Sequence, residues 1–309
     1  MPSMKDKVII VTGSSSGIGF ATLQHLTRMG AKVYMAVPDE EQTRMAIQRL
    51  KDEGLESQVT WHELDLKNAQ SAKSSAERFI EKEEQLDVLV NNAAMISDQG
   101  HPTMNVDGIQ NNMAINYLGP FVFTQTLLPL LEKTASKGRD ARIVNVGSAG
   151  CKDVTYLQFG SKEAWNNKFR FSLLPPLSRY KYSKLAVHLW TNHLAKRLSS
   201  DGSRVMILIV QPGAILSDGA KRNLQSLPFP SFWVWLLGTM MDPQERGAYT
   251  SVFAACAPRD DPNIRHGVYI SPPNVAEEQP KPALDERAQT ELFEFTKQLL
   301  DDIGVGVGL

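Results

Sequence analysis

The sequence predicts an α/β protein in which helices cover both faces of a doubly wound parallel sheet. Short apolar runs rich in β-branched residues recur along the chain, and longer helical patterns alternate with them. Near-continuous apolar strands are typical of a parallel sheet that is buried on both faces. Strands that alternate with helices imply right-handed crossovers. We therefore expect seven parallel strands in a single domain spanning residues 1–309.

Seven strands and seven helices follow from these patterns in chain order. The predicted strands are residues 8–11, 32–35, 59–64, 88–90, 142–146, 205–210 and 268–270. The predicted helices are about residues 17–29, 40–53, 69–84, 108–132, 179–200 and 244–257, with an amphipathic helix near 285–300 in the tail.

Three segments do not fit the alternation. Residues 151–178 form a polar and aromatic insertion, residues 218–242 are rich in aromatic residues and methionine, and residues 272–309 form a C-terminal extension. Long irregular segments in a compact domain are more often lids or binding loops than scaffold. We interpret 218–242 as a substrate lid. A helix on the core, a subunit contact and a patch touching a membrane surface remain alternatives, and the chain is expected to be a monomer or a homodimer.

Composition narrows the class of protein. The hydrophobic fraction is 42% and the charged fraction 22%, as in ordinary globular proteins. The formal net charge of -1 and the scattered Lys and Arg residues give no reason to expect a nucleic-acid partner. Two cysteines, Cys151 and Cys256, favour a reducing compartment. No apolar signal segment or bilayer-spanning stretch is present, so we expect a cytoplasmic protein without a transmembrane segment or a metal site.

A glycine-rich turn joins the first predicted strand to the first helix. Its residues are Gly13, Ser15, Ser16, Gly17, Ile18 and Gly19. Glycines permit a tight turn and a close approach of the backbone, and a helix N-terminus offers free N–H groups and the positive end of a dipole. The turn therefore predicts a site for the pyrophosphate of a dinucleotide.

Two residues on one helix can supply acid–base chemistry. Tyr180 and Lys184 are four residues apart and so share a helix face, whereas Tyr182 lies about 200° round the helix from Tyr180. A tyrosine with a pKa of about 10 is a poor base at neutral pH. A nearby ammonium and a positively charged nicotinamide ring would favour the phenolate and lower that pKa.

These motifs resemble the short-chain dehydrogenase/reductase family, because three residues rather than one separate the first two glycines of the turn. The resemblance spans about residues 5–270 and implies a Rossmann-type fold with a bound NAD(P). It places Asp65 and Leu66 at the adenine, and Asn92 and Ala93 at the floor of the cofactor site. Tyr180 and Lys184 are expected to contact the cofactor as well, with Lys184 holding the ribose. It places Pro212, Gly213, Ile215 and Ser217 at the nicotinamide amide, where Ser217 stands in place of the usual Thr.

The same resemblance supplies the remaining catalytic residues. Ser148, at the end of the fifth strand, is expected to donate a hydrogen bond to the substrate oxygen, and Gly147 stands where relatives often have a second serine. Asn116 is expected to hold a water that links Lys184 to solvent. Within the family, the wide gap between Ser148 and Tyr180 and the segments 243–248 and 267–271 resemble the branch of the retinol dehydrogenases and WW-domain oxidoreductases.

The family pattern fails at the position that normally sets cofactor choice. At the end of the second strand, residues 36–39 contain neither the Arg typical of NADP users nor a well-placed Asp. We favour Asp39 as the N-cap of the next helix over a ribose contact. Because Val37 offers no charge that would repel a 2′-phosphate, NADP(H) is favoured over NAD(H), with Ser14, Ser15 or Arg44 as assisting groups.

The expected activity is the reversible interconversion of a ketone or aldehyde and an alcohol on a bulky lipophilic small molecule, of terpenoid, steroid-like or polyketide type. Two alternatives remain. The chain is a cofactor-binding regulator or scaffold without turnover, or it carries out a redox-neutral cyclisation or dehydration on the same fold.

Overall fold

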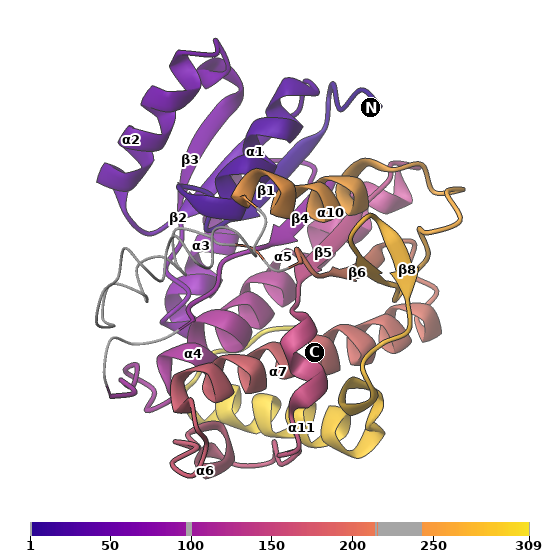
Figure 1. Cartoon of the computed structure of the whole chain (residues 1–309). Helices are drawn as coiled ribbons and strands as arrows, with labels where there is room; N and C mark the ends of the chain where they lie inside the picture. The colour runs from indigo at the N-terminus through magenta and orange to yellow at the C-terminus, as the bar shows by residue number, and fades with distance from the viewer. Residues whose placement is uncertain (1, 97–100, 214, 216–242, 309) are drawn as a thin grey trace.

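The computed structural model describes residues 2–96, 101–213, 215 and 243–308 (Figure 1). These residues build one eight-stranded sheet of order β3-β2-β1-β4-β5-β6-β7-β8. Its strands are β1 Val8–Thr12, β2 Lys32–Val37, β3 Val59–Glu63, β4 Val88–Asn91, β5 Arg142–Val146, β6 Met206–Val210, β7 Tyr269–Ser271 and β8 Val275–Glu277. The first seven strands pair in parallel, which confirms the predicted doubly wound sheet.

The eighth strand corrects the predicted count of seven. β8 runs antiparallel to β7 and pairs Tyr269 with Glu277 and Ser271 with Val275. The chain reverses through Asn274, whose φ of 74° is one that asparagine tolerates in turns. With three residues at the sheet edge and two of them exposed, β8 carries no apolar run by which the sequence could reveal it.

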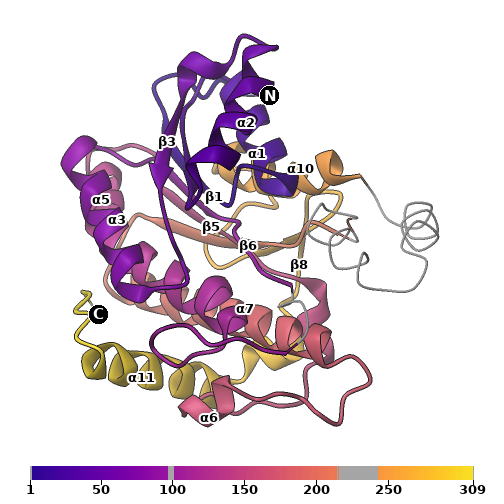
Figure 2. The same cartoon turned by 90° about the vertical axis from the view of Figure 1, so that its left-hand side faces the viewer.

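Helices cover both faces of the sheet (Figures 1 and 2). The helices are α1 Gly17–Arg28, α2 Glu40–Lys51, α3 Ala69–Lys82, α4 Asn111–Met113, α5 Gly119–Ser136, α6 Lys162–Trp165, α7 Pro175–Ser200, α10 Gln244–Cys256 and α11 Glu286–Asp302. α1, α2 and α10 lie on one face and α3, α5 and α7 on the other, with α11 packed outside α7. Segment 218–242 lies outside the described residues.

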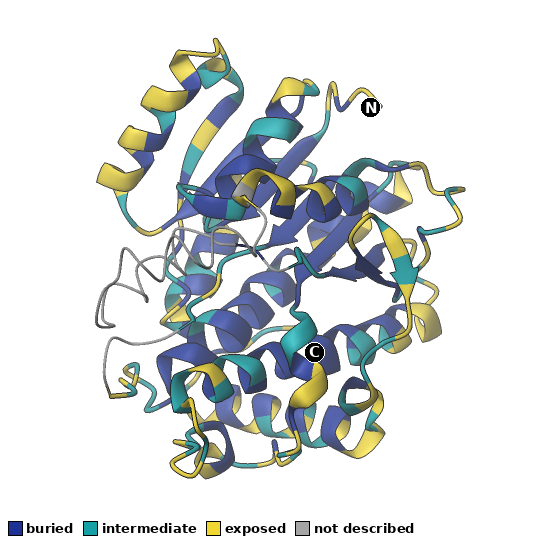
Figure 3. Ribbon diagram, viewed as in Figure 1, coloured by how far each residue is buried: buried dark blue, intermediate teal, exposed yellow. Residues whose placement is uncertain are grey.

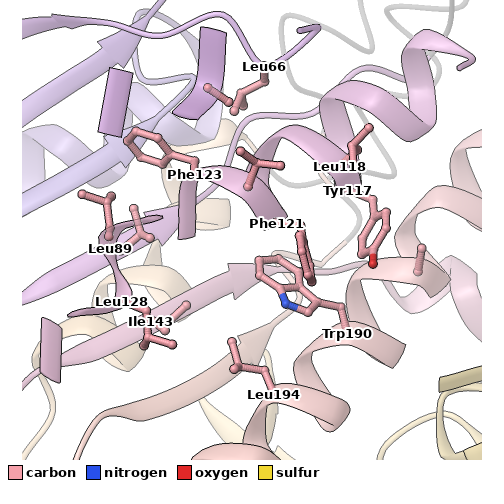
Figure 4. Packing of buried hydrophobic residues seen from close by; sticks show 14 of the residues in the cluster. Leu66, Leu89, Tyr117, Leu118, Phe121, Phe123, Leu128, Ile143, Trp190 and Leu194 are labelled. Carbon is pink, nitrogen blue, oxygen red and sulfur yellow. The ribbon is translucent and has the colours of Figure 1, made fainter. Parts of the chain in front are cut away.

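Each face of the sheet has its own hydrophobic core. Along β1, Ile10 belongs to the cluster with α3, α5 and α7, whereas Ile9 and Val11 belong to the cluster with α1 and α10. This alternation follows from the two-residue period of a strand. Figure 3 shows the central strands as buried throughout, and Figure 4 shows Phe121 and Trp190 side by side in the first cluster.

The helix predicted over residues 108–132 is interrupted. After α4, residues Ala114–Leu118 form a π-helix, in which the Gly119 N–H donates to the Ala114 carbonyl five residues earlier. α5 then begins at Gly119, where any Cβ would overlap the backbone of Leu66. This close approach brings the π-helix to the edge of the sheet where the parallel strands end.

Two further properties of the described residues concern a possible membrane span and possible disulfide or metal sites. Residues 111–136 are long and apolar enough to cross a membrane by length and composition alone, but 83% of the apolar window is buried inside the fold. Cys151 and Cys256 are free thiols, and the described part of the chain contains no cluster of His, Cys, Asp and Glu that could hold a metal ion.

Candidate active site

The glycine-rich turn packs directly against the end of β4. Gly13 has a φ of 63°, and a Cβ at this position would lie 2.8 Å from the Cα of Ala93. A Cβ on Gly19 would overlap the Gly13 carbonyl and the Asn92 amide. The two glycines therefore allow the turn to fold closely on itself and against the end of β4 at the point where β1 meets α1.

The first turn of α1 is built to receive an anion. Its N-cap, Ser16, is extended, and among the described residues no side chain caps the helix and no acidic residue lies in its first turn. The N–H groups at this end, together with the positive end of the helix dipole, fit a pyrophosphate. Ser15 lies on the rim, where its Oγ is 3.4 Å from Oε1 of Gln42. The residues present thus fit a dinucleotide.

Ser14 does not face this anion site. Its side chain is buried, and its hydroxyl donates to the Val11 carbonyl at 2.7 Å. The expectation that Ser14 assists a 2′-phosphate is therefore wrong, because the turn itself uses the hydroxyl. Asp39 is confirmed as the N-cap of α2, since its carboxylate accepts from the backbone N–H groups of Glu41 and Gln42 at 2.8 and 3.0 Å.

The ends of β1 and β4 are tied together at the predicted cofactor floor, and the end of β3 carries Asp65 and Leu66. Thr12 Oγ1 accepts from the backbone N–H groups of Asn92 and Ala93, each at 3.0 Å, and Nδ2 of Asn92 donates to the Thr12 carbonyl at 2.9 Å. Asp65 accepts from the Lys67 N–H at 2.9 Å, and Leu66 is buried against α5. Both segments therefore lie at the strand ends, as predicted.

Tyr180 and Lys184 meet on one face of α7. The Lys184 Nζ lies 5.9 Å from the centre of the Tyr180 ring and donates to the Val146 carbonyl at 2.7 Å. Burial lowers the pKa of Lys184 to about 8. Burial also raises the pKa of Tyr180 to about 12, and a side-chain hydrogen bond with Ser148 opposes this rise. The pKa of Tyr180 is thus raised by burial and not lowered by Lys184 as expected, so the phenol holds its proton at neutral pH.

Tyr182 points to the other side of α7, as its helical position predicts. Its hydroxyl donates to the Gln158 carbonyl, and its ring stacks on Phe159 with centroids 4.5 Å apart. The two tyrosines thus have separate surroundings, and only Tyr180 is next to Lys184.

Ser148 lies at the end of β5, opposite Tyr180. It caps the 3₁₀ turn Ala149–Asp153, and its Oγ accepts from the Gly150 N–H at 3.2 Å. Its backbone N–H donates to Nε2 of His188 at 3.4 Å. Sequence reasoning missed His188, although its position four residues after Lys184 places it on the same helix face.

Asn116 lies in the π-helix and is 2% exposed. Its Oδ1 accepts from the Met95 N–H at 2.7 Å, and its Nδ2 donates to the Met95 carbonyl at 2.9 Å and to Ser183 Oγ at 2.8 Å. Its side chain therefore joins the chain after β4 to α7, next to Lys184. The water predicted at Asn116 stays a prediction.

The predicted nicotinamide segment follows β6. Pro212 precedes Gly213, which has a φ of 88° and whose N–H donates to Gln211 Oε1 at 3.0 Å. Ile215 is buried and packs with Ile18 around Gly247 of α10, where a Cβ would lie 2.9 Å from Ile215 and 3.0 Å from Ile18. Ser217 lies outside the described residues. The structure thus brings the glycine-rich turn and the segment after β6 together through α10.

Comparison with known proteins identifies the family of this chain. Residues 7–160 match the family model described as short chain dehydrogenase. The chain is 38% identical over 301 residues to a short-chain dehydrogenase/reductase of Armillaria gallica, covering 96% of this chain and 93% of the relative. It is 34% identical over 275 residues to retinol dehydrogenase 12 of Mus musculus, covering 86% of this chain and 77% of the relative.

A solved structure extends the comparison. The active-site complex of Pseudomonas aeruginosa RhlG with NADP is similar with a TM-score of 0.66 at 25% identity, covering 87% of this chain and 96% of that chain. The chain therefore belongs to the short-chain dehydrogenase/reductase family, in its retinol-dehydrogenase-like branch, and is an NAD(P)-dependent oxidoreductase.

Proposed function

We propose that the protein interconverts a ketone or aldehyde and the corresponding alcohol, with Tyr180 as the proton donor and acceptor. The observation that carries this proposal is the position of Tyr180 on α7, where the Ser148 side chain opposes the rise of its pKa and the Lys184 Nζ lies 5.9 Å from the centre of its ring. When bound, the nicotinamide cofactor supplies or accepts the hydride.

In the direction of reduction, the substrate oxygen accepts hydrogen bonds from the Ser148 hydroxyl and the Tyr180 phenol. Tyr180 transfers its proton to this oxygen as negative charge develops there. The resulting phenolate is stabilised by the Lys184 ammonium, because an opposite charge nearby favours the ionised form. Lys184, held by the Val146 carbonyl, then returns a proton to Tyr180, and Asn116 belongs to the relay that reprotonates Lys184.

The proposed substrate is a bulky lipophilic molecule of terpenoid, steroid-like or polyketide type. The mouse relative is named for retinol, a lipophilic alcohol. The segment that leads into α7 supports the same class, because Phe171 and Leu173 are almost fully exposed and Leu174 is more than half exposed. An exposed apolar surface of this kind next to the helix of Tyr180 suits the entry of an apolar substrate.

A panel of carbonyl compounds tests the proposed function. With NADPH present, we expect the wild-type enzyme to reduce long isoprenoid or polycyclic aldehydes and ketones and to turn over short polar carbonyls at least about tenfold less efficiently, since each buried CH₂ contributes about 0.8 kcal/mol. The measurement is kcat/KM from the loss of NADPH absorbance. Cofactor binding without oxidation by any compound would refute the proposal, and product formation without an absorbance change would indicate redox-neutral chemistry instead.

We also propose NADP(H) as the preferred cofactor. The carboxylate of Asp39 is engaged in capping α2, and Val37 at the end of β2 is apolar and buried. Arg44 is exposed on α2, and Ser15 is on the rim of the turn. We expect a lower Kd for NADPH than for NADH when both are titrated by quenching of tryptophan fluorescence. A lower Kd for NADH would contradict this preference.

A further inference from the structure

We propose that His188, oriented by Gln279 of the C-terminal extension, positions Ser148 by accepting a hydrogen bond from its backbone N–H. His188 is thus a positioning residue for the reaction, and this inference rests on the proposed function, in which Ser148 donates to the substrate oxygen. It links the end of the chain to the centre of the site.

The hydrogen bonds of the imidazole fix its tautomer. Nε2 of His188 lies 3.4 Å from the backbone nitrogen of Ser148, and Nδ1 lies 2.9 Å from Oε1 of Gln279. A backbone N–H can only donate, so Nε2 must carry no proton. The proton of the neutral ring is then on Nδ1, where the amide oxygen of Gln279 accepts it. Gln279 therefore selects the tautomer that Ser148 requires.

Gly147, the residue before Ser148, leaves room for the His188 ring because it has no side chain. A Cβ on Gly147 would lie 2.5 Å from Nε2 of His188 and 3.0 Å from Cδ1 of Ile209. Any side chain at position 147 would displace the ring from the Ser148 N–H. Relatives often have a second serine at position 147. The glycine in this chain is explained by His188, because a side chain at position 147 would overlap the imidazole ring.

The surroundings keep the imidazole neutral. His188 is 0% exposed, and its ring meets the Tyr269 ring edge-on at 5.3 Å. The ionisable groups next to it are Lys184, one turn earlier on α7, and Tyr269 on β7. Glu277 on β8 pairs with Tyr269, and its carboxylate accepts from the Ser271 hydroxyl at 2.6 Å. Burial lowers the pKa of His188 to about 4, so Nε2 remains an acceptor at physiological pH.

The hydrogen bond matters because it holds the backbone N–H of Ser148, whereas the residue's other hydrogen bonds hold its carbonyl and its hydroxyl. The preceding residue, Gly147, donates its N–H to the Val210 carbonyl at 2.7 Å, which ends the pairing of β5 with β6. Beyond this point the chain leaves the sheet, and the backbone N–H of Ser148 bonds to His188 instead. Loss of that bond would remove the contact that holds the Ser148 N–H and would let the Ser148 hydroxyl shift relative to Tyr180.

The variant Gln279→Glu tests the proposal through the pH profile. A carboxylate beside Nδ1 raises the pKa of His188. Once protonated, both ring nitrogens are donors and Nε2 no longer accepts from Ser148. We expect kcat of the variant to fall about 5- to 100-fold as pH decreases through the raised pKa, which corresponds to a lost hydrogen bond to a buried group. The Kd for NADPH should not change, and the wild type should lack this acidic limb.

Two control variants and one spectroscopic readout separate positioning from a structural effect. Gln279→Met removes the amide without adding a charge, and Glu278→Gln changes an exposed neighbouring carboxylate. Neither variant should create the acidic limb.

In ¹⁵N-histidine-labelled wild-type protein, we expect the His188 ring to be protonated on Nδ1 and not on Nε2. If the wild type turns over but Gln279→Glu shows no acidic limb in its pH profile, the positioning role is overturned while the proposed function stands. A proton on Nε2 of His188 in the wild type has the same meaning. Absence of turnover in the wild type refutes the proposed function and the role of Ser148 together.

Discussion

Replacement of Tyr180 by Phe is expected to lower kcat by about 10²- to 10⁴-fold, the usual contribution of a positioned acid or base. The substitution removes the only group proposed to give the substrate oxygen its proton, while the ring that packs beside Lys184 remains. The Kd for NADPH should therefore change by less than about twofold, because the phosphate-binding turn is untouched. Steady-state turnover and fluorescence titration measure the two effects separately.

The matched control is Tyr182→Phe. It makes the same chemical change two residues away, at a hydroxyl that donates to the Gln158 carbonyl on the opposite side of α7. Its kcat should stay within about threefold of the wild type, and its main effect should be a loss of stability of about 1 kcal/mol. Wild-type turnover in Tyr180→Phe, or equal losses in both variants, would contradict the assignment.

Replacement of Asp87 by Ala is expected to lower the free energy of unfolding by about 3–5 kcal/mol, as for other buried ion pairs that lose one partner. The Asp87 side chain is 0% exposed. Its carboxylate accepts from the Val8 N–H at 2.9 Å, from Lys7 Nζ at 3.1 Å and from Arg139 at 2.8 and 3.1 Å. The substitution would leave a buried N–H and a partly buried guanidinium without this acceptor.

Urea denaturation measures this loss, with Glu77→Ala as the control. Glu77 pairs with Lys73 at 3.7 Å across one turn of α3, where its side chain is half exposed. Such pairs contribute about 0.3–0.5 kcal/mol. A change in unfolding free energy for Asp87→Ala no larger than that of the control would show that the Asp87 cluster does not stabilise the fold.

The sequence predicted those features of the fold that depend on local patterns. Strand runs such as 206–210 are fully buried and carry a continuous apolar signal, and Asp39 has the side chain and spacing of an N-cap. The pair Tyr180 and Lys184 was predictable for the same reason, because helical spacing alone places both on one face. α7 begins at Pro175, four residues before the predicted start, since proline is well tolerated in the first turn of a helix.

What the sequence could not predict depends on contacts between distant residues. Gln279 approaches His188 across 91 residues, and no local pattern marks either residue as a partner of Ser148. The π-helix at Asn116 arises where the helix packs against the end of β3 and against α7. The helix propensities of its residues do not predict such contacts. The burial of Ser14 depends in the same way on the folded turn, in which its hydroxyl donates to the Val11 carbonyl.

The position of α11 limits how two copies of this chain can assemble. α11 lies along α7, where Phe293 stacks on His193 at 4.2 Å and Asn192 donates to the Ala283 carbonyl just before α11. A twofold axis that paired the α7 helices of two subunits on this side would drive their α11 helices into each other. Any symmetric dimer must therefore use another surface or displace the last helix of each subunit.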